Sequence, residues 1–385
     1  MSTLSIITEA LNKIALLVTA IMRDTFHMAI TTNQNDRENG LPSRTSILVA
    51  AARAFGSRDP DEGVRNPDWL ADRLIGPDEL MLIRDHPFGK GLLQDYSDAI
   101  QNPFVAGFAG QMILRTRFID EALVRAVKNG ATQIVILGAG FDSRAYRFRE
   151  LLIDCRVFEV DAEPTQEYKK RRVKDVLGDA PENLTYVRID FAKDRIGDLL
   201  QAAGFREGAK SFYIWEGVCM YLPEESVRET LRMVASHSAP GSSVVLDYAS
   251  SLAIEFGKRT PHGAGGIPED WSEPWIFGVP GANGSEFFRE LGLDSGIPIS
   301  FHNPEAIKRY AIRRDGASYA SRVMEKLRAE AEARIQAGIA PPPLPEGFLE
   351  AQKAIRAAGG VYWLAELTLP EHSKPSQTHT TSDEL

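Results

Sequence analysis

Hydrophobic positions along the chain fall into short unbroken runs and longer amphipathic stretches. The clearest run, Ile134 to Leu137, leads directly into the segment Gly138 to Gly140, and a polar stretch that can begin a helix follows. An apolar run of this length is typical of a strand buried on both faces. Glycines at its end allow a sharp turn and a close approach between backbone and ligand. The pattern therefore predicts a strand and a ligand-binding loop within residues 133–148.

Similar apolar runs alternate with helical patterns over the rest of the chain. Beyond the first strand, we expect strands at residues 155–161, 184–190, 211–218, 243–248, 297–301 and 361–367. Helices are expected between them at residues 163–176, 224–237 and 284–291. This alternation is typical of an α/β fold with a largely parallel sheet, covered on both faces, that binds ligands at the carboxyl ends of its strands.

Residues 45–131 show mainly helical periodicity, which predicts a helical cap in front of the first strand. A capping Asn66 followed by Pro67 indicates the start of one helix, and Gly130 indicates the end of the longest one. The helices expected in the cap cover residues 45–55, 66–76, 89–96 and 108–130.

The first 44 residues form a separate part of the chain. Apolar residues from Leu4 to Ile21 repeat at spacings of three and four, which predicts an amphipathic helix, and residues 32–44 have the composition of a linker. The first basic residue, Lys13, lies inside the apolar pattern, so we expect neither a secretory signal peptide nor stable membrane insertion. The helix is expected to pack on its own domain or to pair with a second copy in a homodimer. Anchoring at a membrane surface is the alternative.

The composition narrows the class of protein. The 385 residues are 43% hydrophobic and 25% charged, which is typical of a globular protein with a sizeable core. A net charge of -9 argues against nucleic acid as the main partner, because such partners require clustered Lys and Arg. Two cysteines, Cys155 and Cys219, form neither a disulfide framework nor a metal site, and they predict buried thiols in a reducing, cytoplasmic environment.

Acidic residues lie at the ends of several expected strands. The glycine loop alone also fits a dinucleotide site, but the third glycine of that fingerprint would fall at Ser143, so the fingerprint fails. Asp161 follows Gly140 by 21 positions, where a carboxylate can accept hydrogen bonds from both hydroxyls of a ribose. Asp190 and Glu216 lie at the ends of the third and fourth expected strands.

Four segments occur in an order known from one protein family. They are GAGFDSRAYRF, VFEVDAEPTQEYKKRRV, YVRIDF and WEGVCMYLPEESV. On these segments, the chain resembles the leucine carboxyl methyltransferase family of class I S-adenosylmethionine-dependent methyltransferases, including its bacterial and polyketide O-methyltransferase branches, over about residues 105–300. The resemblance implies S-adenosylmethionine as the cofactor. It also implies a Rossmann-like seven-stranded sheet, mostly parallel, with residues 361–367 as the antiparallel last strand.

The resemblance implies roles for single residues. Asp161 would bind the ribose hydroxyls, Asp190 and Phe191 would hold the adenine, and Glu216 would lie beneath the cofactor near its methionine amine and ribose. Carboxylates also suit the cationic sulfonium of this cofactor.

An arginine in front of the first strand is implied to bind the carboxylate of the methionine moiety, a role that suits the planar guanidinium group. Arg117 is the first choice and Arg115 the second, since residues two apart cannot share one helix face. Asp142 and Arg144, directly after the glycines, either cap the following helix or line the cofactor site.

The expected reaction constrains the acceptor. Methyl transfer is an in-line displacement, so alignment and exclusion of water are the large effects. A carboxylate is already ionised at neutral pH, whereas a hydroxyl needs a general base, and the seven histidines form no evident basic dyad. We therefore expect a small-molecule carboxylic acid of secondary metabolism as the acceptor. A hydroxyl of a polyketide or aromatic compound is the alternative.

Two aromatic residues are candidates to face this acceptor. Tyr221 follows the fourth expected strand, and Trp275 lies in a Pro/Gly-rich insertion at residues 249–283. Such a loop can form a lid over an apolar substrate or pack on the edge of the sheet. A second insertion, at residues 303–358, carries a strongly charged helix that is typical of a solvated face, and it can also shape the pocket or an interface.

Two functions of other classes stay open at this point. A nicotinamide-dependent oxidoreductase can use the same architecture, although the missing third glycine and the acids at the strand ends disfavour it. A non-catalytic cofactor-binding module is the other, because a binding site does not prove turnover. The predicted organisation is an N-terminal helix and linker at residues 1–44, a cap at 45–131, a methyltransferase domain at 132–370 and a disordered tail at 371–385.

Overall fold

The fold is known from a computed structural model of the chain. It describes residues 42–84, 87–190, 193–257, 275–301, 303–319, 321–338 and 348–371. The predicted N-terminal helix, with its proposed role in a homodimer, lies outside these residues, as do Phe191 and nearly all of the predicted tail.

A seven-stranded sheet forms the centre of the molecule. Its strands are β1 (Gln133–Leu137), β2 (Arg156–Asp161), β3 (Leu184–Arg188), β4 (Ser211–Trp215), β5 (Ser243–Ala249), β6 (Ile299–Ser300) and β7 (Tyr362–Thr368), in the order β3-β2-β1-β4-β5-β7-β6. Strand β7 runs antiparallel to both of its neighbours, and the other pairs are parallel. The Rossmann-like sheet with an antiparallel last strand is thus confirmed.

The strand order reverses next to β1, and this places the ligand site. Gln133 of β1 pairs with Arg156 of β2 on one side and with Ser211 of β4 on the other. Ligands of doubly wound sheets bind in the crevice at such a reversal, beyond the carboxyl ends of the strands. Strand β4 ends at Trp215, three residues before its predicted end, because the chain turns at Gly217 with a φ of 69°.

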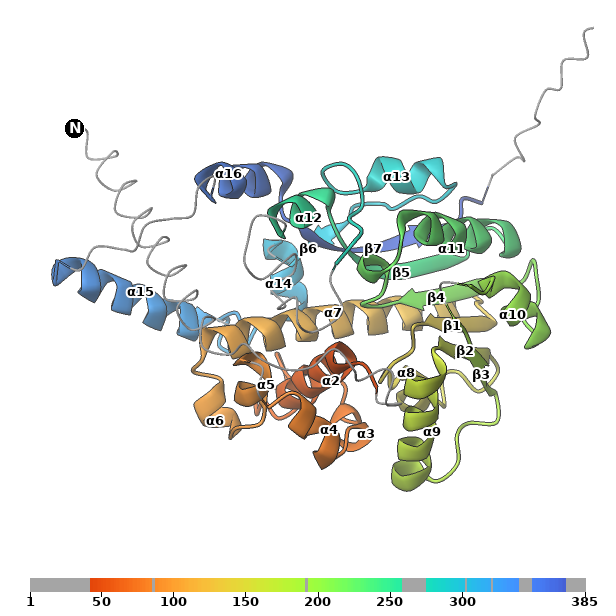
Figure 1. Ribbon diagram of the computed structural model, residues 1–385, viewed down its shortest axis with the longest axis horizontal. Helices are drawn as coiled ribbons and strands as arrows, with labels where there is room; N and C mark the ends of the chain where they lie inside the picture. Colours follow the sequence, from red (N-terminus) through yellow and green to blue (C-terminus); the bar gives the residue numbers. More distant parts are fainter. Residues whose placement is uncertain are drawn as a thin grey trace, which may run out of the picture.

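Helices cover both sides of the sheet. In the cap they are α2 (Arg44–Gly56), α3 (Ala71–Leu74), α4 (Pro77–Leu82), α5 (Pro87–Leu92), α6 (Tyr96–Ala99) and α7 (Pro103–Lys128). The later helices are α8 (Arg144–Arg147), α9 (Glu163–Leu177), α10 (Ile196–Ala202), η2 (Cys219–Tyr221), α11 (Glu224–His237), α12 (Ser251–Gly257), α13 (Ser285–Glu290), α14 (Pro304–Tyr310), α15 (Ser321–Gln336) and α16 (Phe348–Ala358). Figure 1 shows α2 to α6 below the long helix α7, and β4, β5 and β7 above it.

The prediction of one helix over residues 66–76 is wrong. Only Ala71–Leu74 is helical, because side chains before it bind the backbone themselves. The Asn66 side chain accepts from the Asp68 backbone N–H at 2.9 Å, and the Asp68 carboxylate accepts from that of Ala71 at 3.2 Å. Such local bonds compete with helix formation. The predicted helix at 89–96 is likewise divided into α5 and α6, where Asp95 caps α6.

The cap and the sheet share one hydrophobic core. Ile47 and Phe55 of α2 and Ile113 of α7 belong to the same buried cluster as Ile134 and Ile136 of β1. A second cluster lies on the opposite side of the sheet and joins it to α10, α11 and α13. The cap therefore serves as one covering layer of the sheet, and the proposed boundary at residues 131/132 crosses a continuous core.

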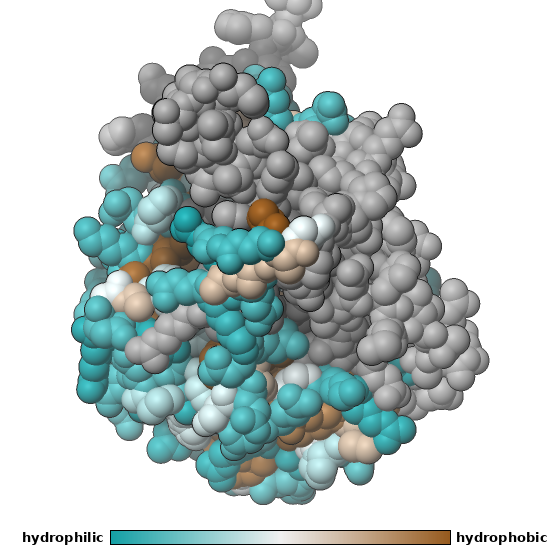
Figure 2. All heavy atoms as spheres, turned by 90° about the vertical axis from the view of Figure 1, so that its left-hand side faces the viewer, coloured by the Kyte–Doolittle hydropathy of each residue, from teal (hydrophilic) through white to brown (hydrophobic). Residues whose placement is uncertain are grey.

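The insertion at 303–358 provides α14, α15 and α16, and α14 packs on the core. Tyr310 of α14 packs against Phe118 of α7, with ring centroids 6.2 Å apart, and donates a hydrogen bond to Glu121. Glu325 and Arg328 of α15 are exposed, as its charges predict. Figure 2 shows that the coloured residues on this side of the molecule are mostly hydrophilic, with separate hydrophobic patches. Across the described ranges, no helix has the length and apolarity needed to cross a bilayer.

Candidate functional site

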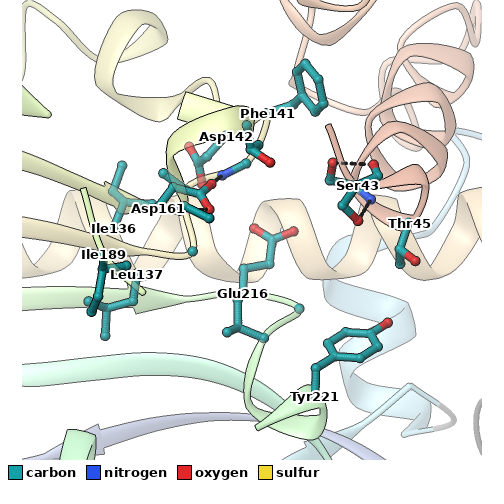
Figure 3. Close-up of a pocket in the computed structure, with 18 of the residues that line it drawn as sticks. Ser43, Thr45, Ile136, Leu137, Phe141, Asp142, Asp161, Ile189, Glu216 and Tyr221 are labelled. Atoms are coloured by element: carbon teal, nitrogen blue, oxygen red, sulfur yellow. Dashed lines mark hydrogen bonds between the residues drawn. The ribbon is translucent and has the colours of Figure 1, made fainter. Parts of the chain in front are cut away.

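A cavity of about 590 Å³ opens beyond the carboxyl ends of β1, β2 and β4. The loop after β1 and the residues after β2 form one wall, and the first turns of α2 form the opposite wall. Figure 3 shows the Glu216 carboxylate pointing into the middle, with Asp161 on one side and Thr45 and Tyr221 on the other.

The glycine loop borders the cavity in a conformation that requires glycine. Gly138 has a φ of 64° and Gly140 a φ of 43°, in the left-handed region. A Cβ atom added to Gly138 would lie 2.4 Å from Cγ2 of Val218, whereas one added to Gly140 would have 3.7 Å of space. Because the Gly138 backbone N–H donates to the Val160 carbonyl at 2.8 Å, the loop is also fixed to β2.

Asp161 lies beside this loop and is half-buried. Its Oδ2 accepts from the Gly140 backbone N–H at 2.5 Å, and its Oδ1 accepts from that of Ala162 at 2.7 Å. These bonds fix the carboxylate at the cavity wall. Each carboxylate oxygen can accept a second hydrogen bond, so the group can receive two hydroxyls of a ligand.

Glu216 forms the floor of the cavity between two arginines. Its Oε1 lies 2.8 Å from Nε of Arg115, and its Oε2 accepts from Nη1 of Arg144 at 2.7 Å. Burial alone would raise the pKa of Glu216, but the two guanidinium groups hold it well below its usual range. The carboxylate is therefore firmly ionised.

Arg115 is held in place by a second acid. Its Nη1 donates to Oδ2 of Asp247, a fully buried residue of β5, at 2.7 Å. Asp247 also accepts from the Gly217 backbone N–H and from the Tyr362 hydroxyl, each at 2.5 Å. Arg115 lines the cavity, and among the described residues it pairs with acids through Nε and Nη1. Its remaining nitrogen, Nη2, can donate to an anionic ligand group.

Arg117, the first choice for binding a carboxylate, does not reach the cavity. Its guanidinium group donates to the carbonyls of Gly63 at 2.6 Å and Tyr310 at 3.1 Å, and also to those of Glu62 and Arg65. It thereby anchors the cap loop to α14. Because residues two apart point to different sides of a helix, Arg115 faces the cavity when Arg117 faces this loop.

The arginines and acids continue into a buried ionic network. Nε of Arg144 donates to Asp120 at 2.7 Å and its Nη1 to Asp142 at 2.5 Å, while Arg147 bonds Asp120 at 2.8 Å. Asp142 also lines the cavity and accepts from the Arg144 backbone N–H at 2.7 Å. Asp142 thus lines the cavity and binds the first backbone N–H of α8, whose N-cap residue is Ser143, whereas Arg144 lies behind the wall.

The cap completes this network through α2. Arg53 donates from Nε to Asp68 at 2.8 Å and from Nη2 to the carbonyl of Phe141, in the glycine loop, at 2.8 Å. The Ser143 hydroxyl donates to Asp68 at 2.5 Å. Sequence reasoning missed Arg53, Asp68, Asp120 and Asp247, since their partners lie up to 132 positions away and no local pattern indicates them.

The remaining predicted site residues lie at different places. Asp190 lines the cavity and pairs with Nζ of Lys193 at 2.7 Å, on the exposed side. Tyr221 also lines the cavity. Trp275 does not, because it stacks on Tyr362 with ring centroids 5.4 Å apart.

The described end of the insertion at 249–283 packs on the core. Phe277 is buried, and the backbone N–H groups of Ile276 and Phe277 donate to the Met220 carbonyl at 2.9 and 3.2 Å. This contact agrees with the packing alternative for residues 275–279. The rest of the expected lid, residues 258–274, lies outside the described chain. Both cysteines are free and buried, as predicted.

Sequence comparisons identify the relatives of this chain. Residues 46–235 match the model of the leucine carboxyl methyltransferase family. A Bacillus subtilis protein named "Putative S-adenosyl-L-methionine-dependent methyltransferase YktD" is 34% identical over 222 residues, which cover 54% of this chain and 71% of the relative. The chain belongs to the leucine carboxyl methyltransferase family. It is accordingly an S-adenosylmethionine-dependent methyltransferase, and a nicotinamide-dependent oxidoreductase is no longer an alternative.

Other comparisons add less. A Mycobacterium marinum protein of the same description is 32% identical over 211 residues, covering 54% of this methyltransferase and 67% of the relative. Among solved structures, the StiE O-MT (residues 961–1257) is 15% identical, covers 67% of this chain and 75% of its own, and has a TM-score of 0.37. Geranyl diphosphate C-methyltransferase from Streptomyces coelicolor is 12% identical, with coverages of 68% and 84% and a TM-score of 0.36. Scores this low carry no weight for function.

The glycine loop allows a test of its steric constraint. We expect Gly138→Ala to lower the free energy of unfolding by about 3 kcal/mol, because the new Cβ meets Val218 and the φ is unfavourable. Gly140→Ala, for which only the φ is unfavourable, should lower the free energy of unfolding by about 1 kcal/mol. Urea unfolding measures both. A Val218→Ala background should reduce the cost of Gly138→Ala, and equal costs with and without Val218 would contradict the steric explanation.

Arg117 provides a second test. We expect Arg117→Met to lower the free energy of unfolding by about 1–3 kcal/mol, since several carbonyls lose their donor. The affinity for S-adenosylmethionine should stay within about two-fold of the wild-type value, because the side chain lies outside the cavity. Chemical unfolding and titration calorimetry give the two quantities. A loss of cofactor affinity in a variant that is still folded would show that Arg117 belongs to the cofactor site.

Proposed function

We propose that this methyltransferase is an O-methyltransferase that binds S-adenosylmethionine in the cavity and methylates a carboxylate of a small-molecule acid. The observation that supports it is the ionised Glu216, bound by two arginines in the middle of the cavity. It separates a side suited to the cofactor from a side suited to an acceptor (Figure 3).

The polar groups on the Asp161 side fit the cofactor. Asp161 offers two fixed acceptor oxygens to the ribose hydroxyls, and Nη2 of Arg115 offers a donor to the carboxylate of the methionine moiety. The loop that contains Gly138 and Gly140 lines the same side of the cavity. Asp190 and Phe191 are assigned to the adenine by the family resemblance. When bound, the cofactor supplies a methyl group on a positively charged sulfur.

The opposite side of the cavity is assigned to the acceptor. Ser43, Thr45 and Tyr221 bring hydroxyl groups to it, and Val49 and Leu222 add apolar surface. Oγ1 of Thr45 is buried and has no hydrogen-bond partner within the described part of the chain. A small acid can place its apolar body against the aliphatic residues while the hydroxyls orient its carboxylate, which is the alignment that an in-line displacement needs.

The state of Glu216 favours an acceptor that is already ionised. Because the pKa of Glu216 is held so low, its carboxylate is a poor general base at neutral pH. A carboxylic acid has lost its proton under these conditions and needs no base. The family description, leucine carboxyl methyltransferase, agrees with carboxyl chemistry. A hydroxyl of a polyketide or aromatic compound is the second candidate, with Tyr221 beside it.

Cofactor binding is tested with single substitutions. We expect Arg115→Gln and Asp161→Asn each to weaken binding of S-adenosylmethionine by about 1–3 kcal/mol, because each removes a charge-assisted hydrogen bond. Titration calorimetry measures the affinities, with Arg117→Met as the matched arginine control. Unchanged affinity in both folded site variants would disprove the assignment.

The acceptor class is tested by product analysis. Wild-type protein with S-adenosylmethionine and a panel of carboxylic acids should give products one methyl group heavier, which mild base hydrolyses because they are esters. The rate with a carboxylic acid should stay level between about pH 6 and 8, since the acceptor is ionised throughout. A base-stable methyl ether, with a rate that rises with pH, would show hydroxyl methylation instead.

A further inference from the structure

The buried network beneath the cavity does not balance its charges. It contains four arginines, each paired with at least one acid in a continuous series of contacts: Arg53, Arg115, Arg144 and Arg147. The five acids paired with them are Asp68, Asp120, Asp142, Glu216 and Asp247. Four guanidinium groups against five carboxylates leave one negative charge among these described side chains.

Both signs of charge in this network reach the cavity. Asp142, Glu216, Arg53 and Arg115 line it, whereas the other three acids and the other two arginines lie behind its wall. Side chains of the network are at most about a tenth exposed, so water and salt screen their charges little. Asp161, at the rim, adds a further carboxylate that is held by backbone N–H groups. The buried network as a whole and Asp161 therefore leave a net negative charge around the inner end of the cavity.

The ligands of a methyltransferase differ by one charge before and after the reaction. S-adenosylmethionine carries a sulfonium cation. Methyl transfer forms a bond from the methyl carbon to the acceptor oxygen and breaks its bond to sulfur, whose electron pair stays behind and leaves a neutral thioether. An uncompensated negative charge in a poorly screened site attracts S-adenosylmethionine more than the neutral product, S-adenosylhomocysteine.

We propose that the excess negative charge of this network, to which Asp142 contributes at the cavity wall, makes the protein prefer the sulfonium cofactor to its neutral product. Asp142 is thus a specificity-determining residue. Its charge favours binding of S-adenosylmethionine over binding of S-adenosylhomocysteine, the product that is left after the methyl group has been transferred. This role is independent of the acceptor and of the proposed carboxyl methylation.

The test compares three ligands by titration calorimetry: S-adenosylmethionine, S-adenosylhomocysteine and sinefungin, which carries a protonated amine in place of the sulfonium. Asp142→Asn makes the network neutral and keeps an acceptor for the Arg144 backbone N–H. We expect it to weaken both cationic ligands on the order of ten-fold, about 1.4 kcal/mol, while the affinity for S-adenosylhomocysteine stays within about two-fold.

Two further variants separate charge from structure. Asp142→Glu keeps the charge and should keep the preference for cationic ligands. Arg147→Gln removes a positive charge from the same network, away from the cavity wall, and should increase that preference. A structural defect would lower the affinities for all three ligands together. It would not produce opposite changes in preference when an acid or an arginine is removed.

The outcomes decide the proposal. The measured quantity is the dissociation constant of S-adenosylhomocysteine divided by that of S-adenosylmethionine. We expect this ratio to be lower in Asp142→Asn and unchanged in Asp142→Glu, and we expect the difference to persist at about 0.5 M salt. An unchanged ratio in Asp142→Asn, or an equal loss of affinity for all three ligands, overturns the proposal. If Arg147→Gln does not fold, the two substitutions at Asp142 still decide. Failure to methylate any carboxylic acid would leave these binding constants unaffected.

Discussion

The contact between Glu216 and its two arginines is the interaction on which the rest of the site depends. A buried ion pair is expensive to desolvate, and removing one partner leaves an uncompensated charge. Here the cost is offset because each arginine has a second acid: Asp247 for Arg115, and Asp120 for Arg144. The network therefore has to form as a whole, with every partner in position.

This requirement joins parts of the chain that lie far apart in sequence. Arg53 of α2 holds the Phe141 carbonyl in the glycine loop, and Asp120 of α7 holds two arginines of α8. Tyr362 of β7 donates to Asp247 beneath the site. The cap helices, the loop after β1 and the last strand thus act on the same cavity. We infer that the cap positions the cofactor loop in addition to covering the sheet.

The sequence was informative where the controlling interactions are local. The apolar run before Gly138 fixes both the strand and the loop, and the spacing from Gly140 to Asp161 corresponds to a direct hydrogen bond in the structure. It was uninformative where partners are distant. Arg115 and Arg117 differ in role because of which side of α7 meets the cavity, and Asp247 lies inside an apolar strand pattern with no neighbouring signal.

A crystal structure of the protein with bound S-adenosylhomocysteine tests the account most directly. We expect Arg115 at hydrogen-bond distance from the ligand carboxylate, Asp161 bound to both ribose hydroxyls, and Glu216 still between Arg115 and Arg144. Arg117 should remain on the carbonyls of the cap loop. A ligand held by Arg117, or a Glu216 side chain released from its arginines, would contradict it.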